Sequence, residues 1–356
     1  MGKLKVMSLF SGIGAFEAAL RNIGVDFELV GFSEIDKYAI KSYCAIHNVD
    51  ENLNFGDVAK FEKDKLPDFD ILVGGSPCQS FSVAGLRKGF EDTRGTLFFE
   101  YIRTLLAKKP KYFIFENVKG LISHDKGKTI EIIAKAFSDA GYCIDLEILN
   151  SKFFNVPQQR ERLFIIGIRS DNVKNEDWIK QAPKNVLQKG RERLAKLDIN
   201  TFNFNWPPQL NIDTSLEDIL ESSVNDKFYI TEKKSEEFFA KNQVINSSPS
   251  KFKVSKIGNV HPSGKGMNGA VYSSCGLSPT ITTNKGEGIK IHIEKERRIR
   301  KETPLECFRL QAFSDDDFYA AKSAGNSNTQ LYKLAANSIT VTVLEEIYKE
   351  LLNTYK

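Results

Sequence analysis

The stretch KVMSLFSGIGAFE, residues 5–17, indicates how the fold begins. Its first part, KVMSLF (5–10), is apolar and predicts a buried strand, and FSGIGAFE (10–17) predicts a glycine turn that leads into a helix. Gly12 and Gly14 let the backbone approach a ligand, and the helix N-terminus offers free N–H groups. Many turns contain such a pair of glycines, so the turn alone is weak evidence for a ligand site.

The alternation of strand and helix continues through the first 170 residues. Apolar runs predict strands at 5–10, 27–34, 70–75, 111–117, 144–150 and 162–169. Periodic segments predict helices at 14–23, 36–47, 95–108 and 127–140, the second capped by Ser33 or Asp36. This order predicts an α/β fold with a doubly wound, mostly parallel, Rossmann-like sheet.

The pattern changes after residue 169. Residues 171–200 are charged and predict a solvated surface segment, and WPPQ (206–209) is typical of a boundary. Glycine-rich polar loops follow, clearest at 258–269 and 282–288, whereas 340–354 resume an amphipathic helix. We therefore predict a large first domain (1–213, completed by 332–356), a smaller domain (214–297) and a connecting segment (298–331).

Composition excludes several classes of protein. The five cysteines among 356 residues form no CxxC or His/Cys cluster, so we expect neither a disulfide framework nor a metal site. No apolar run approaches the roughly 18 residues that span a membrane, and a cytoplasmic location is expected. The net charge of +4 permits nucleic acid as a partner without requiring it.

Two acidic residues follow strands near the glycine turn. Glu34 ends the second strand, where a carboxylate can bind ribose hydroxyls. Asp57 can accept a bond from an adenine amine, or it caps a helix over 57–62. These features do not separate a nicotinamide dinucleotide from S-adenosylmethionine.

Reactive side chains follow two further strands. Cys78, in GGSPCQSFSVAG (74–85), is positioned as a nucleophile, or it is a buried structural cysteine. Glu116 ends an apolar strand, so we expect burial to raise its pKa and let it exchange a proton with a ring nitrogen. An ion pair with Arg160 or Arg162 is the alternative for Glu116, and both roles can hold together.

Six motifs occur in a fixed order: FSGIGAFE, SPCQSFS, FENV, QQRER, RxxTPxECxRLQ (300–311) and ANS (336–338). This set resembles the bacterial C5-cytosine DNA methyltransferases of restriction–modification systems over nearly the whole chain. GLRKGFEDTRGTLFF (85–99) resembles the mobile catalytic loop of that family. The resemblance implies an S-adenosylmethionine-binding domain, a small target-recognition domain and a target cytosine flipped out of duplex DNA.

The resemblance also implies residue roles. Cys78 would add to cytosine C6 and Glu116 would protonate N3, after which C5 accepts the methyl group and Cys78 is eliminated. Arg162 would hold O2, with Arg160 beside it. The cofactor would be held by Phe10, Ser11, Gly12, Ile13, Gly14, Glu34, Ile35, Asp57, Val58, Asn337 and Ser338. Two residues depart from the family pattern, Ala336 where glycine is usual and Ile35 where an aromatic is frequent.

Loop residues are the candidates for DNA contact. Gln79, Ser82 and Arg94 would belong to the closing loop, and the smaller domain would contribute Lys265, Asn268, Thr280, Asn284, Lys285 and Glu287. Lysine can read guanine, asparagine adenine and glutamate cytosine, although lysines more often contact phosphates only. The loops suggest a short palindromic site with a GC-rich core, such as GCNGC. We expect a monomer that binds double-stranded DNA, with a cognate restriction endonuclease as a further partner.

Three alternatives stay open. A tRNA cytosine-5 methyltransferase of the same fold would share Cys78, Glu116 and the cofactor site. A catalytically silent DNA-binding relative would be expected to have lost some of these residues. A nicotinamide-dependent oxidoreductase fits the glycine turn and Glu34 but leaves SPCQ, FENV and QQRER unexplained.

Overall fold

The computed structural model describes residues 2–77, 97–179, 184–211, 213–242, 251–261, 263–266, 268–283 and 288–354. Seven predicted site residues lie outside these ranges: Cys78, Gln79, Ser82, Arg94, Asn284, Lys285 and Glu287.

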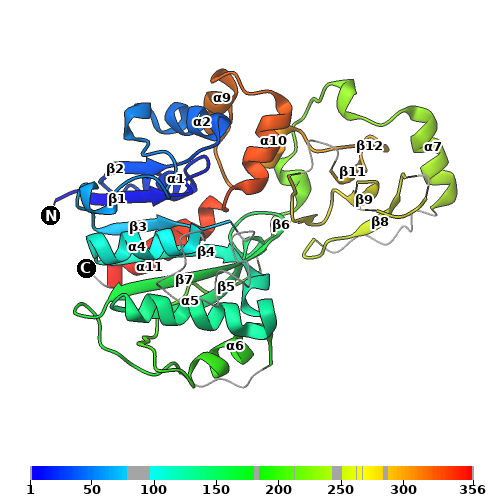
Figure 1. Ribbon diagram of the computed structural model, residues 1–356. Coiled ribbons are helices and arrows are strands. Elements are labelled where there is room, and N and C mark those ends of the chain that lie inside the picture. Colours follow the sequence, from blue (N-terminus) through cyan, green and yellow to red (C-terminus); the bar gives the residue numbers. More distant parts are fainter. Residues whose placement is uncertain are drawn as a thin grey trace.

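The predicted large sheet is present, in the strand order β2-β1-β3-β4-β7-β5 (Figure 1). Its strands are β1 (Leu4–Leu9), β2 (Phe27–Ser33), β3 (Ile71–Gly74), β4 (Tyr112–Val118), β5 (Tyr142–Asn150) and β7 (Glu161–Arg169). Neighbouring strands from β2 to β4 are parallel, and β7 runs antiparallel to both β4 and β5. The α/β, mostly parallel fold predicted from the sequence is therefore confirmed.

Helices cover both faces of this sheet, which explains why its strands are apolar throughout. Val6 on β1 faces a core shared with α1 (Ala15–Asn22) and α11 (Val341–Thr354), whereas Met7 faces a core shared with α4 (Leu97–Lys108) and α5 (Lys128–Asp139). The remaining α-helices of the described residues are α2 (Lys37–His47), α6 (Val186–Leu194), α7 (Glu232–Lys241), α8 (Pro304–Arg309), α9 (Asp315–Ser323) and α10 (Asn328–Asn337). Because α11 packs against α1, the C-terminal part of the chain returns to the large sheet.

A smaller sheet lies beside the large one, to the right in Figure 1. Its order is β12-β11-β9-β8, and Phe238, Val271 and Ile299 form the centre of its small core. The strands are β8 (Lys256–Asn259), β9 (Ala270–Ser273), β11 (Lys290–Ile293) and β12 (Arg298–Arg300). A separate two-stranded pairing joins β10 (Ser278–Pro279) to β6 (Gln158–Gln159) and so connects this region to the start of β7.

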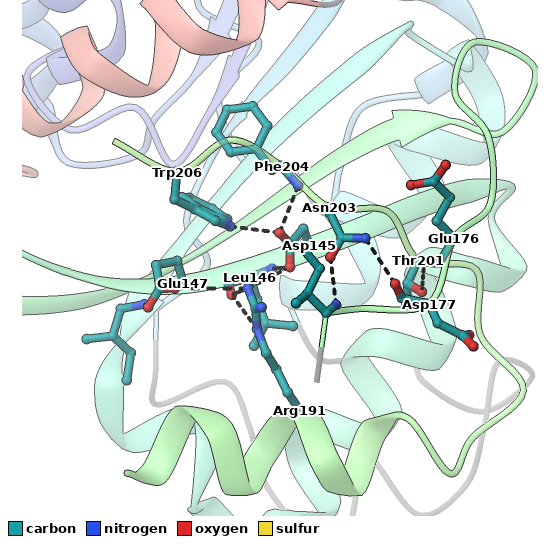
Figure 2. A network of polar contacts seen from close by, with 12 residues as sticks. Asp145, Leu146, Glu147, Glu176, Asp177, Arg191, Thr201, Asn203, Phe204 and Trp206 are labelled. Carbon is teal, nitrogen blue, oxygen red and sulfur yellow. Dashed lines mark hydrogen bonds and ion pairs between the residues drawn. The ribbon is translucent and has the colours of Figure 1, made fainter. Parts of the chain in front are cut away.

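Most described residues of the segment 171–200 are exposed or half-buried, as the predicted solvated surface segment requires, but α6 within it is partly buried. Leu187 and Leu194 of α6 are buried, and Arg191 of the same helix donates to the buried carboxylate of Asp145 on β5 at 2.8 Å. The same carboxylate accepts bonds from the Trp206 indole N–H at 2.8 Å and from a neighbouring backbone N–H (Figure 2). The charged sequence of α6 did not predict this role, because nothing in it indicates that the buried carboxylate of Asp145 lies next to Arg191.

The RxxTPxECxRLQ motif builds the junction that precedes α8. The fully buried Arg300 makes two bonds to the Glu306 carboxylate, at 2.7 and 2.8 Å. Glu306 also completes a capping box with Thr303 at the start of α8. The motif therefore ties β12 to the helices that return to the large sheet.

No helix in the described part of the chain is long and apolar enough to cross a membrane.

Glu302 gives this junction a predicted pH dependence. It is 5% exposed, its carboxyl accepts from Ser278 at 3.4 Å, and burial raises its pKa to about 7. Because this folded-state pKa lies above the unfolded value, the carboxyl destabilises the fold increasingly as pH rises between those two values. We compare the unfolding free energy of Glu302→Gln with that of wild type at each pH. We expect this difference to be about 2 kcal/mol larger, in favour of the variant, at pH 8 than at pH 5.

Urea unfolding at both pH values measures this difference. The matched control is Glu232→Gln, at an exposed position on α7. A stability difference for Glu302→Gln that is the same at pH 5 and pH 8 would refute the prediction.

Candidate active site

A cavity of about 620 Å³ opens where the carboxyl ends of β1, β2, β3 and β4 meet. The predicted site residues that line it come from the glycine turn, from the ends of β2 and β4, from the loop at 57–58, from the start of β7 and from the end of α10. They are Phe10, Gly12, Glu34, Ile35, Asp57, Val58, Glu116, Arg160, Arg162 and Asn337. Because the ends of parallel strands share one edge of the sheet, residues more than 300 positions apart in sequence lie around one cavity.

The glycine turn is fastened by Glu34. The Gly12 N–H donates to Glu34 Oε2 at 2.9 Å, and the N–H groups of Ile35 and Asp36 donate to Oε1 at 2.8 and 2.9 Å. A carboxylate has about four acceptor positions, so one on Oε2 remains for a ligand. The acid that the sequence assigned to ribose binding thus also fixes the shape of the turn.

The same end of the cavity carries two further acids. Asp57 Oδ1 accepts from the Ala59 N–H at 3.0 Å, so Asp57 caps a turn and not the helix considered for 57–62. Asp36 accepts from the Tyr38 N–H and is the cap of α2. Of the two caps predicted for this helix, Ser33 and Asp36, the structure therefore has the second. Ile35 is 73% exposed although it lines the cavity, which leaves its apolar side chain open to a ligand.

Glu116 and Arg162 form an ion pair at the opposite end. Arg162 Nε lies 3.2 Å from Glu116 Oε1, and both side chains are largely buried. Burial raises the pKa of Glu116, and the positive charges of Arg162 and Arg160 oppose that rise. The expected upward pKa shift and the expected ion pair therefore occur together, with the carboxyl kept inside the cavity.

The end of β3 approaches Glu116 closely because residue 75 is a glycine. A Cβ atom at Gly75 would lie 2.4 Å from the Glu116 carbonyl oxygen and 2.9 Å from its Oε2. The Asn117 amide donates to the Ser76 carbonyl at 2.9 Å and holds the same segment. The chain that leads to Cys78 is thus bound to the strand end that carries Glu116, although Cys78 lies outside the described residues.

Arg160 connects the two ends of the cavity. It is 3% exposed, and its Nη2 donates to the carbonyl oxygens of Ala336 at 3.1 Å and Ser338 at 2.6 Å. Its Nε and Nη1 have no partner among the described residues. Burial and the neighbouring Arg162 lower the pKa of Arg160 to about 9. Arg160 therefore binds the motif at the end of α10 while keeping unused donors beside the cavity.

The other predicted residues lie elsewhere. Ser11, Ile13, Gly14 and Ser338 do not line the cavity, and Ile13 belongs to the core on the α1 side. Lys265 and Asn268 are exposed in the loop before β9, and Thr280 donates to the Gln159 carbonyl at 2.7 Å. The structure brings ten of the cofactor and catalytic candidates around the cavity and leaves Lys265 and Asn268 outside it.

One charged pair at the cavity was not predicted from the sequence. Lys333 Nζ on α10 lies 2.7 Å from Asp36 Oδ2, and both residues line the cavity. The only sequence signal for this pair is that Asp36 is a candidate cap of α2, because Lys333 is 297 positions away. The pair joins α2 and α10 across the mouth of the site.

With this geometry established, comparison with known proteins assigns the family. The profile described as C-5 cytosine-specific DNA methylase matches residues 4–353. The chain belongs to this family. Membership confirms the resemblance derived from the six motifs and makes the chain a methyltransferase by descent.

Relatives of known name agree over the full chain. The chain is 54% identical to "Orphan methyltransferase M.SPRI" of Bacillus phage SPR, with 100% of this chain and 99% of the relative covered. It is 35% identical to "Type II methyltransferase M.Bsp6I" of Bacillus sp. (strain RFL6), with 98% and 100% covered.

Solved structures share the fold. The S. pombe Dnmt2 methyltransferase superposes with a TM-score of 0.68 at 18% identity and covers 99% of each chain. A putative DNA modification methyltransferase encoded within an E. coli prophage gives a TM-score of 0.57 at 19% identity, with 99% of each chain covered. These likenesses confirm the Rossmann-like methyltransferase fold.

Proposed function

We propose that the chain transfers a methyl group from S-adenosylmethionine to C5 of a cytosine that is flipped out of duplex DNA. The observation that carries this proposal is the Glu116–Arg162 pair at 3.2 Å, because it faces the same cavity as the glycine turn fixed by Glu34. An extrahelical base and a nucleoside cofactor can share one cavity only if the groups that bind the base and the groups that bind the cofactor both line it.

The cavity suits the proposed cofactor in size and charge. Its volume of about 620 Å³ falls within the range of small-molecule sites, about 300–1,000 Å³. Glu34 and Asp57 offer acceptors for the hydroxyl and amine groups of an adenosine, and Asn337 lines the wall beside them. S-adenosylmethionine supplies an electrophilic methyl group when bound.

Base recognition is assigned to the opposite end. We assign Glu116 to the N3/N4 edge of cytosine and Arg162 to O2, because a carboxyl and a guanidinium side by side can bond adjacent polar atoms of one ring. The raised pKa of Glu116 favours the protonated carboxyl that N3 protonation requires. Arg160 would hold the ANS motif (336–338) in place beside them through its bonds to Ala336 and Ser338.

Cys78 is assigned as the nucleophile. Its thiolate adds to C6 while Glu116 gives a proton to N3, and this makes C5 electron-rich enough to take the methyl group. Methyl transfer would release S-adenosylhomocysteine. Loss of the C5 proton to a base, elimination of the Cys78 thiolate and return of the N3 proton to Glu116 would then restore the aromatic ring. Gln79, Ser82 and Arg94 are assigned to the loop that closes over the DNA.

DNA reading is assigned to the segment 214–297, as the predicted target-recognition domain. Lys265 and Asn268 are exposed there, as a base or phosphate contact requires. Relatives named as orphan and as type II methyltransferases both match the chain, so the partner endonuclease, like the monomeric state, stays a prediction.

A mechanism-based inhibitor tests the chemistry. Duplex DNA with 5-fluorocytosine at the target should give a covalent adduct that needs S-adenosylmethionine and survives denaturation, because fluorine at C5 cannot leave as a proton does. The adduct is measured as a shifted band and by mass spectrometry, with unmodified cytosine as control. Active protein that forms no adduct would contradict addition to C6, and an adduct on fluorinated tRNA alone would favour the RNA-modifying alternative.

A further inference from the structure

A histidine that none of the roles above uses lies behind the glycine turn. His47 is the last residue of α2, and its Nε2 lies 3.1 Å from the carbonyl oxygen of Ile13. A carbonyl oxygen can only accept, so Nε2 carries the proton and donates. Burial lowers the pKa of His47 to about 4, so the ring is neutral at physiological pH.

Gly14 makes room for this ring. A Cβ atom at residue 14 would lie 2.0 Å from His47 Nε2 and 2.9 Å from Tyr43 Cε2, and the glycine has a φ of +81°. The Tyr43 and His47 rings lie 4.7 Å apart, and Tyr43 in turn stacks on Phe32 of β2. Gly14 does not line the cavity. The absence of a side chain at this position therefore allows the turn to pack against α2.

The end of α2 is fixed independently of the turn. Arg21 on α1 donates to the Ile46 carbonyl at 3.4 Å and forms an ion pair with Asp317 of α9 at 2.9 Å. The other end of α2 reaches the cavity, where Asp36 pairs with Lys333. A rigid helix thus touches the glycine turn from behind and the cavity from the front.

We infer that His47 is a positioning residue that holds the Ile13–Gly14 peptide of the glycine turn in its cofactor-binding shape. Glu34 fastens the turn on the cavity side through the Gly12 N–H, and His47 fastens it on the far side. Without the His47 bond the turn can shift away from Glu34, so cofactor affinity falls while the groups around Glu116 keep their arrangement. The inference rests on the proposed use of S-adenosylmethionine.

A matched pair of variants isolates the hydrogen bond. Glutamine and methionine have nearly the same length and shape, but only glutamine keeps an N–H donor near the position of Nε2. In calorimetric titration with S-adenosylmethionine, His47→Met should raise Kd at least fivefold, and His47→Gln should stay within twofold of wild type. In steady-state assays His47→Met should raise the KM for the cofactor and leave kcat within twofold. Its Kd for duplex DNA without cofactor should not change.

His124→Met, at a histidine outside the cavity, controls for the substitution itself. His47→Leu replaces His47→Met if the latter does not fold, as judged by thermal unfolding. Wild-type affinity in the donor-free variant, or equal weakening in His47→Gln, would overturn the inference. Absence of saturable S-adenosylmethionine binding to wild-type protein would overturn the proposed function itself, and the inference with it.

Discussion

Replacing Cys78 with alanine is expected to lower methyl transfer by roughly 10⁴-fold or more, the order seen when a covalent catalyst loses its nucleophile. Without a thiolate at C6, C5 of cytosine stays too electron-poor to accept the methyl group. Transfer of tritium from labelled S-adenosylmethionine to DNA measures the loss.

Binding separates a chemical role of Cys78 from a structural one. Cys78→Ala should keep the wild-type affinity for duplex DNA in gel-shift titration, because the thiol is assigned to the reaction and not to recognition. Cys275→Ala, at a half-buried cysteine outside the cavity, should retain activity and serves as the matched control. Turnover near the wild-type rate in Cys78→Ala would remove the nucleophile assignment.

Replacing Glu116 with glutamine is expected to lower kcat by roughly 10²-fold or more, as for loss of a general acid. The amide preserves the size of the side chain and can still accept from Arg162, but it cannot give a proton to N3. Single-turnover rates on a cytosine-containing duplex measure the effect on chemistry directly.

The pH profile adds a second readout. Burial raises the pKa of Glu116, and the reaction uses the protonated carboxyl, so the wild-type rate should fall as pH rises through that pKa. Glu116→Gln should lack this limb of the profile. Glu147→Gln on β5, whose half-buried carboxyl also has a raised pKa, is the control outside the cavity. An effect of Glu116→Gln under threefold would indicate a purely structural carboxylate.

The local sequence predicted the large sheet because its strands are buried on both faces and therefore apolar. The run DILVGG (70–75) and the observed β3 at Ile71–Gly74 agree for this reason. Glu34 and Glu116 were each predicted at the end of a strand, and both line the cavity because the carboxyl ends of parallel strands meet at one edge of a sheet.

Other features depend on residues far apart in sequence and had no local signal. The role of α6 rests on Asp145 opposite Arg191, and the mouth of the cavity rests on Lys333 opposite Asp36. Gly14 was assigned to ligand approach, yet its close neighbour is His47. In each case the sequence identified a charged or small residue, and only the fold supplied its partner.

The most direct test of the central claim is to express the protein in a bacterium without DNA cytosine methylation and to sequence its DNA after bisulfite conversion. Our account predicts cytosines protected from conversion within one short sequence motif, and Cys78→Ala should abolish that protection. Complete conversion of the DNA in cells that contain soluble, cofactor-bound protein would contradict the account.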